Sequence, residues 1–322
     1  MSVSLRRIVS FLACSLGMFV AANTAAQDYP TKPIRLIVAN SAGVPVDTIA
    51  RIVSPEMSKF LGQPFVVENK PGAGQMIGYE YVAKQAPADG YTMVLVSVPV
   101  LATMPVEREN LRFDPLKDLP PFVGLVEQRN VFGSSSKEPW TTFNELVANA
   151  KANPGKLNYG AASLLNRLIA EVLIRDLRLD VVYIPYSAAG PYVLALVSGE
   201  MHMGVAGETV VVPFGDKFKV LAVSGKERST AYPNAPTFAE LGYPQIPGLS
   251  YSLNVRGGTP SVIVDKLYAA ASKAMQHSEV RAQFARLQYS IANETPEAAA
   301  KNLAEQVRLF SDIAKKIGIK PI

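Results

Sequence analysis

The sequence of 322 residues holds few of the side chains that most often carry out chemistry. It has one cysteine, Cys14, and only two histidines, His202 and His277. A single cysteine excludes a disulfide framework and any cysteine-rich metal site. Two histidines leave little choice of general base, which disfavours Ser-His-Asp and Cys-His catalysis. What remains is an enzyme that uses carboxylates or a cofactor, or a protein that only binds.

Residues 1–26 have the pattern of an export signal. Arg6 and Arg7 precede an apolar run, Ile8–Ala22, that is short for a membrane-spanning helix but suits the core of a signal peptide. Small residues then lead to an expected cleavage site near Ala26. The mature chain would contain no cysteine, which fits an exported protein of a bacterial periplasm whose stability comes from its packing.

The net charge and the hydropathy of the chain bear on whether its partner is a small molecule, a nucleic acid or a membrane. The formal net charge is +5, and two of the positive charges lie in residues 1–26. This weak basic balance is compatible with a small anionic ligand and does not argue for nucleic acid. No later stretch is long and apolar enough to span a membrane. We therefore expect no nucleic acid partner, no cofactor and no metal for the mature protein.

Hydrophobic periodicity predicts two consecutive α/β units followed by helices. The first unit alternates strands with helices, at residues 33–39, 47–62, 64–68, 75–85 and 92–97. The second unit repeats the pattern, with strands at 156–159, 181–184, 201–205 and 218–223 and helices at 141–152, 164–177 and 190–197. Three amphipathic helices are expected at 265–275, 279–287 and 296–317. The order of the first unit predicts a mainly parallel sheet with helices on both faces.

The joints between strands and helices carry small or turn-forming residues, at 41–43, 69–74, 160–163 and 187–190. In open α/β sheets, ligands lie outside the carboxyl ends of the strands, where bare N–H groups and helix N-termini attract anions. Four such joints favour a cleft that binds a carboxylate or a phosphate. For any one joint, the alternative is that glycine and alanine merely permit a tight turn.

Several side chains at these joints admit both a functional and a structural interpretation. Asp47 either lines the cleft or caps the helix that follows, and we favour the cap, with an indirect part in shaping the loop. Ser41 and Ser97 either reach a ligand or satisfy their own loops. Gly72 and Gly74 fall short of a dinucleotide fingerprint, because the third glycine comes one residue late. A bare turn that donates N–H groups to a carboxylate is the better interpretation.

The second unit offers a cation and three tyrosines near its joints. Arg167 lies near the start of a predicted helix, where a cation gains nothing from the helix dipole. This placement suggests a guanidinium that forks onto a ligand carboxylate, and the alternative is a pair with Glu171 four residues later. Tyr159, Tyr186 and Tyr192 either contact the ligand or belong to the core.

Apolar side chains at the joints bear on the shape of the ligand. Val44, Val98, Leu164 and Leu165 would line the cleft under this assignment of the loops. They favour a ligand with a hydrocarbon or aromatic body between polar ends, such as a longer diacid. A small hydroxy acid would fit such a lining less well.

Several strings of the mature chain resemble one known family, in the order and at the spacing of that family. They are LGQPFVVENKPGAG from Leu61, the DGY turn at 89–91, NPGKLNYG at 153–160, VVYIPY at 181–186, LAVSGKER at 221–228 and the closing GIKP. On these residues the chain resembles the Bug-type (TctC-like) periplasmic solute-binding proteins of tripartite tricarboxylate transporters. The resemblance covers nearly all of residues 28–322.

The resemblance implies an α/β fold like that of type II periplasmic binding proteins, with two α/β domains joined by a hinge around a ligand cleft. Domain 1 would comprise residues 27–127 and 249–322, and domain 2 would comprise residues 128–248. It also implies a monomeric periplasmic receptor without enzymatic activity. Such a receptor closes on a small organic carboxylate and delivers it to integral-membrane permease subunits.

The sequence departs from the family pattern in several of the joints. Residues 39–47 read ANSAGVPVD where the family usually has PFPPGG, a small residue and then T/S-D. Arg167–Leu168 stands where a His-Leu pair is usual, and Ser187–Ala189 replaces Lys-Gly-Gly. Val205–Ala206, with Glu208 two positions on, replaces an aromatic residue and an Asp. These departures bear on the class of ligand and not on the fold.

We therefore predict that ligand contacts come from the joints of both units. The predicted contact residues are Ser41, Ala42, Gly43, Val44, Asp47, Gly72, Ala73, Gly74, Ser97, Val98, Tyr159, Gly160, Ala161, Ala162, Ser163, Asn166, Arg167, Tyr186, Ser187, Ala188, Ala189 and Glu208. No catalytic residue and no metal ligand is predicted.

Two other functions stay open from the sequence. An exported hydrolase or lyase would need a pair of carboxylates, but no Asp/Glu pair in the joints has an obvious partner and no G-x-S-x-G motif is present. A sensor subunit that presents the bound ligand to a signalling partner would share the fold of a transport receptor. The sequence therefore cannot separate sensing from transport, and it does not identify the ligand.

Overall fold

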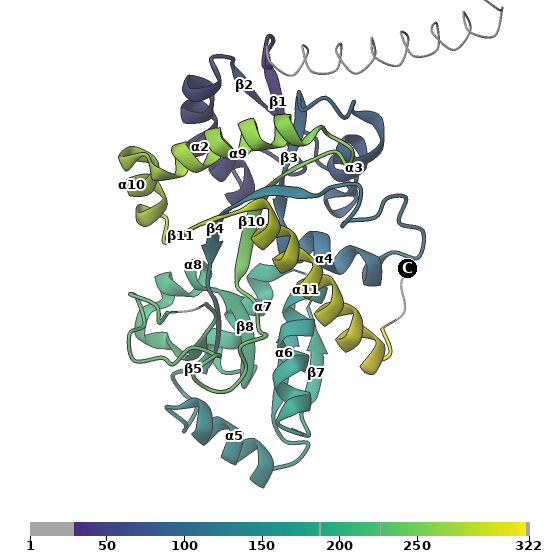
Figure 1. Cartoon of the computed structure of the whole chain (residues 1–322). Coiled ribbons are helices and arrows are strands. Elements are labelled where there is room, and N and C mark those ends of the chain that lie inside the picture. The colour runs from purple at the N-terminus through teal and green to yellow at the C-terminus, as the bar shows by residue number, and fades with distance from the viewer. Residues whose placement is uncertain (1–28, 187, 226, 320–322) are drawn as a thin grey trace, which may run out of the picture.

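The computed structural model describes residues 29–186, 188–225 and 227–319. The predicted signal peptide and Ser187 lie outside these ranges. The described strands form two sheets, and helices pack against both (Figure 1). Within the described ranges, no helix combines the length and the apolar character that crossing a bilayer requires.

The first sheet has six strands in the order β11-β4-β10-β3-β1-β2. These strands are β1 (Ile34–Val38), β2 (Phe65–Asn69), β3 (Thr92–Ser97), β4 (Pro121–Gln128), β10 (Leu249–Val255) and β11 (Ser290–Glu294). β1 pairs parallel with β2 and β3. β10 pairs antiparallel with β3 and β4, and β11 pairs antiparallel with β4.

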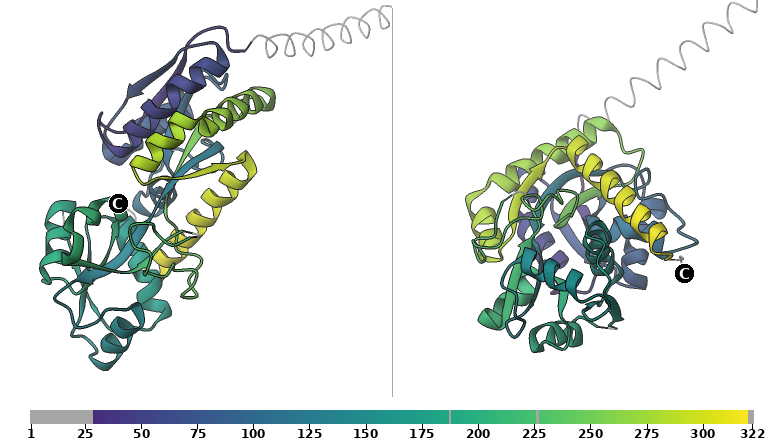
Figure 2. Two further views of the ribbon diagram at one scale, coloured as in Figure 1. Left: turned by 90° about the vertical axis from the view of Figure 1, so that its left-hand side faces the viewer. Right: turned by 90° about the horizontal axis from the view of Figure 1, so that it is seen from below.

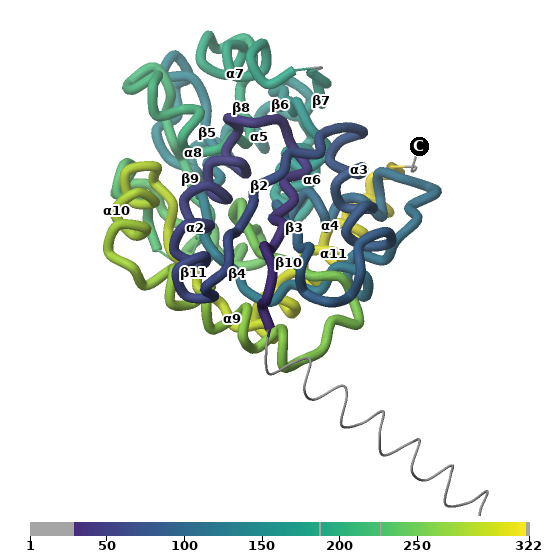
Figure 3. The backbone as a smooth tube through the Cα atoms, turned by 90° about the horizontal axis from the view of Figure 1, so that it is seen from above, coloured from purple at the N-terminus to yellow at the C-terminus, as the bar shows by residue number. Residues whose placement is uncertain are grey.

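Alternating side chains of the first sheet bury against helices on both faces. Leu36 and Val38 belong to one buried cluster with residues of α2, α9 and α10, whereas Ile37 belongs to another with residues of α3, α4 and α11. Figures 2 and 3 show these two sets of helices on opposite sides of the strands. The helices are α2 (Pro45–Leu61), α3 (Met76–Glu80), α4 (Val98–Glu107), α9 (Ser261–Gln276), α10 (Ser278–Arg286) and α11 (Pro296–Lys316).

The second sheet has five strands in the order β7-β6-β8-β5-β9. Its strands are β5 (Asn130–Ser135), β6 (Asn158–Ala161), β7 (Val182–Pro185), β8 (Met203–Gly207) and β9 (Phe218–Val223). β6 pairs parallel with β7 and β8, and β5 pairs antiparallel with β8 and β9. Its helices are α5 (Phe143–Ala152), α6 (Leu164–Asp176), α7 (Ala189–Ser198) and the short α8 (Glu208–Val211).

The prediction of a mainly parallel first sheet was wrong, because both sheets are mixed. The strands joined by local helices are parallel, as expected for β-α-β units. The antiparallel members are β4, β5, β9, β10 and β11, and of these β4, β5 and β11 were not predicted at all. α4 was also missed, since Pro99 and Pro105 within it speak against a helix.

Local capping signals explain where several helices begin and end. α2 ends at Gly62, which adopts the left-handed conformation that glycine tolerates best. α5 begins with Thr142 as N-cap, and Thr142 and Glu145 form a capping box. α6 begins with Ser163, whose hydroxyl accepts the N–H of Asn166.

The chain passes between the two sheets at two places that lie together, here called the two crossings. Arg129 alone separates β4 from β5, and the chain returns through Gly248 into β10. The Asn130 N–H donates to Ser224 Oγ (2.7 Å), and its side-chain amide donates to the Pro247 carbonyl (3.1 Å). We propose on this basis that the domain boundaries lie at the crossings, close to the positions that the sequence predicts.

A shared hydrophobic cluster joins the two units beside the crossings. α4 of the first unit packs against α6 of the second, and α11 contacts both (Figure 2). Val98 and Leu101 of α4, Leu165 and Leu168 of α6, and Phe310 of α11 belong to the same buried cluster. Because α4 and α6 each begin at the carboxyl end of a strand, this packing turns the carboxyl edges of the two sheets toward each other.

Candidate functional site

The carboxyl ends of parallel strands gather the predicted loops of each unit at one edge. In the first sheet, β2, β1 and β3 run parallel in that spatial order, so the loops that follow them lie together. In the second sheet, β7, β6 and β8 do the same. The candidate site is therefore the space between two sets of three loops, one set from each unit.

A carboxylate network shapes the loop after β1. Asp47 is only 2% exposed, and its carboxylate accepts hydrogen bonds from the Gly43 N–H (2.9 Å) and from Asn69 Nδ2 (2.9 Å). Arg51 donates to both carboxylate oxygens (2.8 and 3.1 Å), which lowers the pKa of Asp47 to about 2. The predicted cap was wrong, because the N-cap of α2 is Val44. Asp47 instead holds the loop from inside the first turn of the helix.

Tyr79 connects the glycine-rich loop after β2 to the end of β3. Its hydroxyl donates to Gln75 Oε1 (2.7 Å) and accepts the Ser97 N–H (3.3 Å). The neighbouring Gly78 allows α3 to approach β1, because a Cβ at this position would lie 2.6 Å from Ala39 Cβ. The Tyr79 hydroxyl thus joins the loop after β2 to the end of β3, and the close approach of Gly78 to Ala39 joins it to the loop after β1.

The glycine-rich loop itself turns through left-handed backbone. Gly72, Ala73, Gly74 and Gln75 have φ values of 130°, 48°, 63° and 77°. Glycine adopts these angles without steric cost, whereas Ala73 and Gln75 are held there by their surroundings. Gly72, Ala73 and Gly74 are exposed, and donation of their N–H groups to a ligand stays a prediction.

Neutral hydrogen bonds hold the loops of the second unit. Asn166 Nδ2 and the Tyr192 hydroxyl both donate to the carbonyl of Val205 (3.1 and 2.8 Å). The first turns of α6 and α7 are therefore tied to the middle of β8. α7 itself has Ala188 as N-cap and no side-chain cap, so its first N–H groups keep their capacity to donate.

Arg167 lies in the first turn of α6, with its guanidinium over the ring of Tyr183 at 4.3 Å from the centroid. Its Nε lies 3.9 Å from the Glu171 carboxylate and has no hydrogen-bond partner. Glu171 also accepts the Tyr159 hydroxyl and pairs with Arg175 (3.5 Å). This geometry favours the predicted alternative, the pair between Arg167 and Glu171. Contact between Arg167 and a ligand stays a prediction.

Burial separates the predicted contact residues into two groups. The loop tips are exposed or half-buried at Ser41, Ala42, Gly43, Val44, Gly72, Ala73, Gly74, Ala162, Ser163, Asn166, Arg167, Tyr186, Ala188 and Ala189. The residues beneath them are buried at Asp47, Ser97, Val98, Tyr159, Gly160, Ala161 and Glu208. Burial favours a supporting role over direct contact for the second group, and it favours the core interpretation for Tyr159 and Tyr192. Ser187 lies outside the described residues.

Glu208 is the clearest case of a predicted contact with a different role. It is the first residue of α8 and is 1% exposed. Its N–H donates to the Arg129 carbonyl (3.0 Å), and its carboxylate accepts the Ser229 hydroxyl. Ser229 Oγ in turn accepts the N–H groups of Ala231 and Tyr232 (3.0 and 3.2 Å). Glu208 therefore anchors the segment after β9 to the first crossing.

The two histidines lie outside the predicted loops. His202 precedes β8 by one residue, so the predicted strand began too early, and its Nδ1 lies 2.7 Å from Asn158 Oδ1. His277 separates α9 from α10 and lies 3.8 Å from the Glu56 carboxylate. Within the part of the chain that the structure describes, no group of three or more His, Cys, Asp or Glu residues is arranged to hold a metal ion.

Sequence reasoning missed two residues that organise the site. Arg51 follows Asp47 by four residues, a spacing that places both on one helix face, so the pair was open to prediction. Tyr79 gave no such signal, because its role depends on the distance between α3 and β3, which no local pattern encodes.

Comparison with known proteins identifies the family. The chain matches the tripartite tricarboxylate transporter family receptor over residues 49–319. It is 29% identical to the protein BugT of Bordetella pertussis, over 96% of this chain and 98% of that protein.

Two solved structures agree with this match. A TctC solute-binding protein from Polaromonas, solved without ligand, superposes with a TM-score of 0.80 at 27% identity, over 89% of this chain and 99% of that one. MatC from Rhodopseudomonas palustris, solved with bound malate, superposes with a TM-score of 0.68 at 28% identity, over 88% of this chain and 99% of that one. The chain therefore belongs to the tripartite tricarboxylate transporter receptor family, and it has the two-domain α/β fold of the family's Bug-type solute-binding proteins.

Proposed function

We propose that this protein is a periplasmic receptor that binds a dicarboxylate between its two units and delivers it to membrane permease subunits. One observation carries the proposal: each carboxyl edge presents exposed small residues beside a helix without a side-chain cap, α2 after Val44 and α7 after Ala188. Each uncapped N-terminus offers N–H donors and about half a positive charge. One anion-binding edge for each carboxylate accounts for a diacid, and malate in MatC supports that class.

We propose that the ligand is released unchanged. The carboxylates closest to the loops are already engaged, Asp47 by Arg51 and Glu208 by Ser229. Neither is therefore placed to act as a general acid or base on a bound substrate. Closure of both units around the diacid, with contacts from each, would be the signal that the permease recognises.

The lining supports a ligand body of modest apolar character. Of the four predicted apolar residues, Val44 and Leu164 are half-buried at the loops, whereas Val98 and Leu165 are 4% and 8% exposed and lie in the shared cluster. Two apolar side chains suit a short aliphatic chain better than an aromatic ring. We therefore propose an aliphatic dicarboxylate.

Titration calorimetry on residues 27–322 tests this function, with succinate, malate, adipate, phthalate and the monocarboxylate butyrate. We expect micromolar affinity, about −8 kcal/mol, for at least one aliphatic diacid. Butyrate should bind at least tenfold more weakly, because one edge would stay empty. A protein that binds none of these acids would contradict the proposed function.

A charge placed at the start of α7 gives a sharper test. Gly190 is the second residue of α7 and is exposed, and a Cβ there meets nothing within 4 Å. Gly190→Asp puts a negative charge where it favours the helix but repels a ligand carboxylate. Affinity for the diacid should fall at least tenfold while the melting temperature holds. Gln276→Glu, at the exposed end of α9, is the matched control; equal losses in both variants would exclude α7 from the site.

A further inference from the structure

Two neighbouring residues at the first crossing belong to one unit by their backbone and contact the other unit by their side chain. The first is Gln128, the last residue of β4, which pairs with Leu249 of β10 in the first sheet. Its side-chain amide donates to Thr209 Oγ1 of α8, in the second unit (2.6 Å). Gln128 is only 6% exposed, so water has little access to its side of this hydrogen bond.

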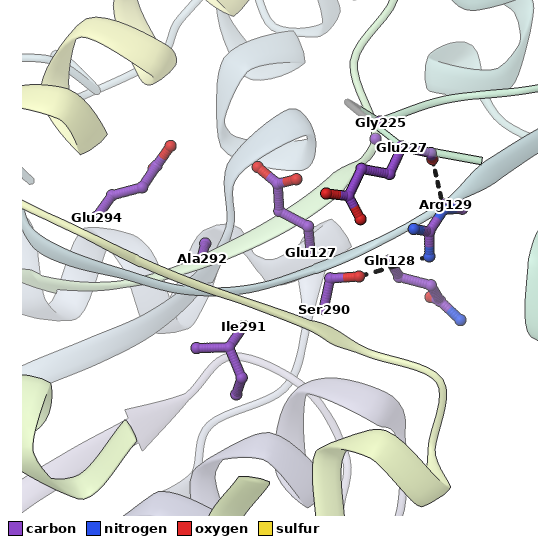
Figure 4. A pocket seen from close by; sticks show the side chains of 10 residues that line it. Glu127, Gln128, Arg129, Gly225, Glu227, Ser290, Ile291, Ala292 and Glu294 are labelled. Atoms are coloured by element: carbon purple, nitrogen blue, oxygen red, sulfur yellow. Dashed lines mark hydrogen bonds between the residues drawn. The ribbon is translucent and has the colours of Figure 1, made fainter. Parts of the chain in front are cut away.

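Arg129 has the reverse arrangement. Its carbonyl accepts the Glu208 N–H (3.0 Å), and its guanidinium donates to the carbonyls of Glu227 and Arg228 (3.3 and 3.4 Å). All three partners belong to the second unit. The same guanidinium also donates to Ser290 Oγ of β11, in the first unit (3.4 Å; Figure 4). Arg129 is therefore fixed to the second unit and contacts the first through one hydroxyl.

The Gln128–Thr209 and Arg129–Ser290 hydrogen bonds, here called the Thr209 latch and the Ser290 latch, lie on opposite faces of the chain at the crossing. Successive side chains of a strand point to opposite faces. Ser290 lies opposite residue 127 in the ladder of β11 and β4, so residues 127, 129 and 290 share one face. Gln128 points to the other face, where Thr209 lies.

The two latches also lie on different sides of the crossing along the sheets. Thr209 is the second residue of α8, which follows β8, and β8 supplies one of the three loops of the second unit. β11 is an edge strand of the first sheet, with β4 and β10 between it and the parallel strands. The Thr209 latch is therefore on the side of the proposed dicarboxylate site, and the Ser290 latch is on the far side.

We propose that the two latches set the angle between the units, and that Gln128 and Arg129 thereby act as positioning residues for ligand binding. Rotation about the crossings that closes the units over a ligand brings groups together on the ligand side and separates them on the far side. The Ser290 latch therefore resists closing, and the Thr209 latch resists opening.

The other contacts between the units do not select an angle as sharply. α4 and α6 pack through apolar side chains of the shared cluster. Hydrophobic packing has no preferred direction, whereas a hydrogen bond requires a defined distance and angle. The effect on ligand affinity rests on the proposed function, because it needs a ligand that both units contact. The effect on the angle does not.

The distance between two spin labels reports the angle without any ligand. Val66 of β2 and Val182 of β7 are 49% and 51% exposed, and they belong to the edge strands farthest from the crossings. Their separation should therefore change most on rotation. Cys14 is the one cysteine of the sequence and precedes residues 27–322, so Val66→Cys and Val182→Cys supply the only labelled sites in that protein.

Double electron–electron resonance on this labelled protein gives the first readout. Ser290→Ala should shorten the mean distance between the labels, and Thr209→Val should lengthen it. Ser290→Thr and Thr209→Ser keep the hydroxyl groups and should retain the wild-type distance. Ser136→Ala is the matched control for loss of a serine hydroxyl, because Ser136 is exposed in the turn after β5 and lies outside both latches.

Titration calorimetry with malate and adipate gives the second readout. Ser290→Ala should bind the diacid about threefold more tightly, and Thr209→Val about threefold more weakly, as expected for the loss of one hydrogen bond that favours one angle. Opposite signs are the signature of the two latches. A hydroxyl with a merely structural role would weaken binding in both variants.

Two outcomes would overturn the proposal. One is a label distance in the free protein that neither Ser290→Ala nor Thr209→Val changes. The other is a shift of the same sign in both variants, which would mean that each hydrogen bond only stiffens the crossing. Thermal unfolding of each variant reports whether it has folded. If neither diacid binds, the proposed function fails and the label distances still decide whether the latches set the angle. If a diacid binds and its affinity does not follow the distances, the positioning role fails and the proposed function stands.

Discussion

The loops of the two units are built from different chemistry. In the first unit an ionised network of Asp47, Arg51 and Asn69 holds the loop after β1. In the second unit, Asn166 and Tyr192 converge on one carbonyl through neutral hydrogen bonds. Charged hydrogen bonds are stronger but depend on pH, whereas a neutral one contributes about 1 kcal/mol. From these two sets of contacts we propose that the loop after β1 gives a ligand a more fixed surface than the start of α7 does.

The largest effect is expected from Asp47→Ala. It leaves the Gly43 N–H and Arg51 without the carboxylate that each now contacts, and it removes a buried acceptor of Asn69 Nδ2. We expect a loss of about 3 kcal/mol in the free energy of unfolding, measured with urea, and at least a tenfold loss of diacid affinity. Unchanged diacid affinity would mean that the loop after β1 is not part of the site.

The loss of unfolding free energy in Asp47→Ala should depend on pH, because the Asp47 carboxylate contributes only when it is ionised. Its pKa is about 2 in the folded protein and about 3.9 in an unfolded chain, so its contribution is full above pH 4 and disappears as pH falls toward 2. The difference in stability between wild type and Asp47→Ala should therefore shrink over this range. A difference that stays constant from pH 6 to pH 2.5 would show that packing, not charge, holds the loop.

Substitutions at Gly78 in the first unit and Gly160 in the second compare how tightly the backbone is packed in each. A Cβ at Gly78 would lie 2.6 and 2.8 Å from Cβ and Cα of Ala39, the residue that follows β1. A Cβ at Gly160 would mainly meet the flexible end of Met201. We expect Gly78→Ala to lower the free energy of unfolding by about 2 kcal/mol and Gly160→Ala by under about 1 kcal/mol. The reverse order in urea unfolding would contradict a rigid first unit.

The smallest effect is expected from Tyr192→Phe. It removes one of the two donors to the Val205 carbonyl and keeps the buried ring, while Asn166 still donates. We expect a loss of about 1 kcal/mol in unfolding free energy and a change in diacid affinity of less than threefold. Hydrogen exchange should show faster opening of the start of α7 alone. A tenfold loss of affinity would mean that the second unit is as fixed as the first.

The parallel half of each sheet was open to prediction because its signals are local. A β-branched run, an apolar helical stripe and a stop at Gly62 are enough to place β1 and α2. β5 was hidden for the opposite reason. Gly133 interrupts its apolar run, because a Cβ there would meet the carbonyl of Lys219 on the distant β9. The need for glycine at position 133 comes from β9, which lies more than 80 residues further along the chain and so leaves no sign in the sequence around β5.

The positions of the candidate loops could be predicted from the sequence. Which of their residues face the ligand and which only support the loop could not. Small residues at the strand ends indicated which loops gather at one edge. Whether Asp47 faces the ligand or the loop depends on Arg51 and Asn69, and Asn69 arrives from another strand. The stacking of Arg167 on Tyr183 likewise joins α6 to β7. These contacts belong to the tertiary structure and leave no trace in local spacing.

The register of the first sheet shows that the second unit is inserted between two paired strands of the first. Gln128, the last residue of β4, lies opposite Leu249, the first residue of β10, in an antiparallel ladder. β4 and β10 are therefore the two arms of a hairpin, and its turn is the whole second unit. A link of a few residues between Gln128 and Leu249 would complete the first sheet by itself. In genetic terms the second unit is a cassette, which recombination can exchange without breaking a single strand pairing of the sheet that carries it.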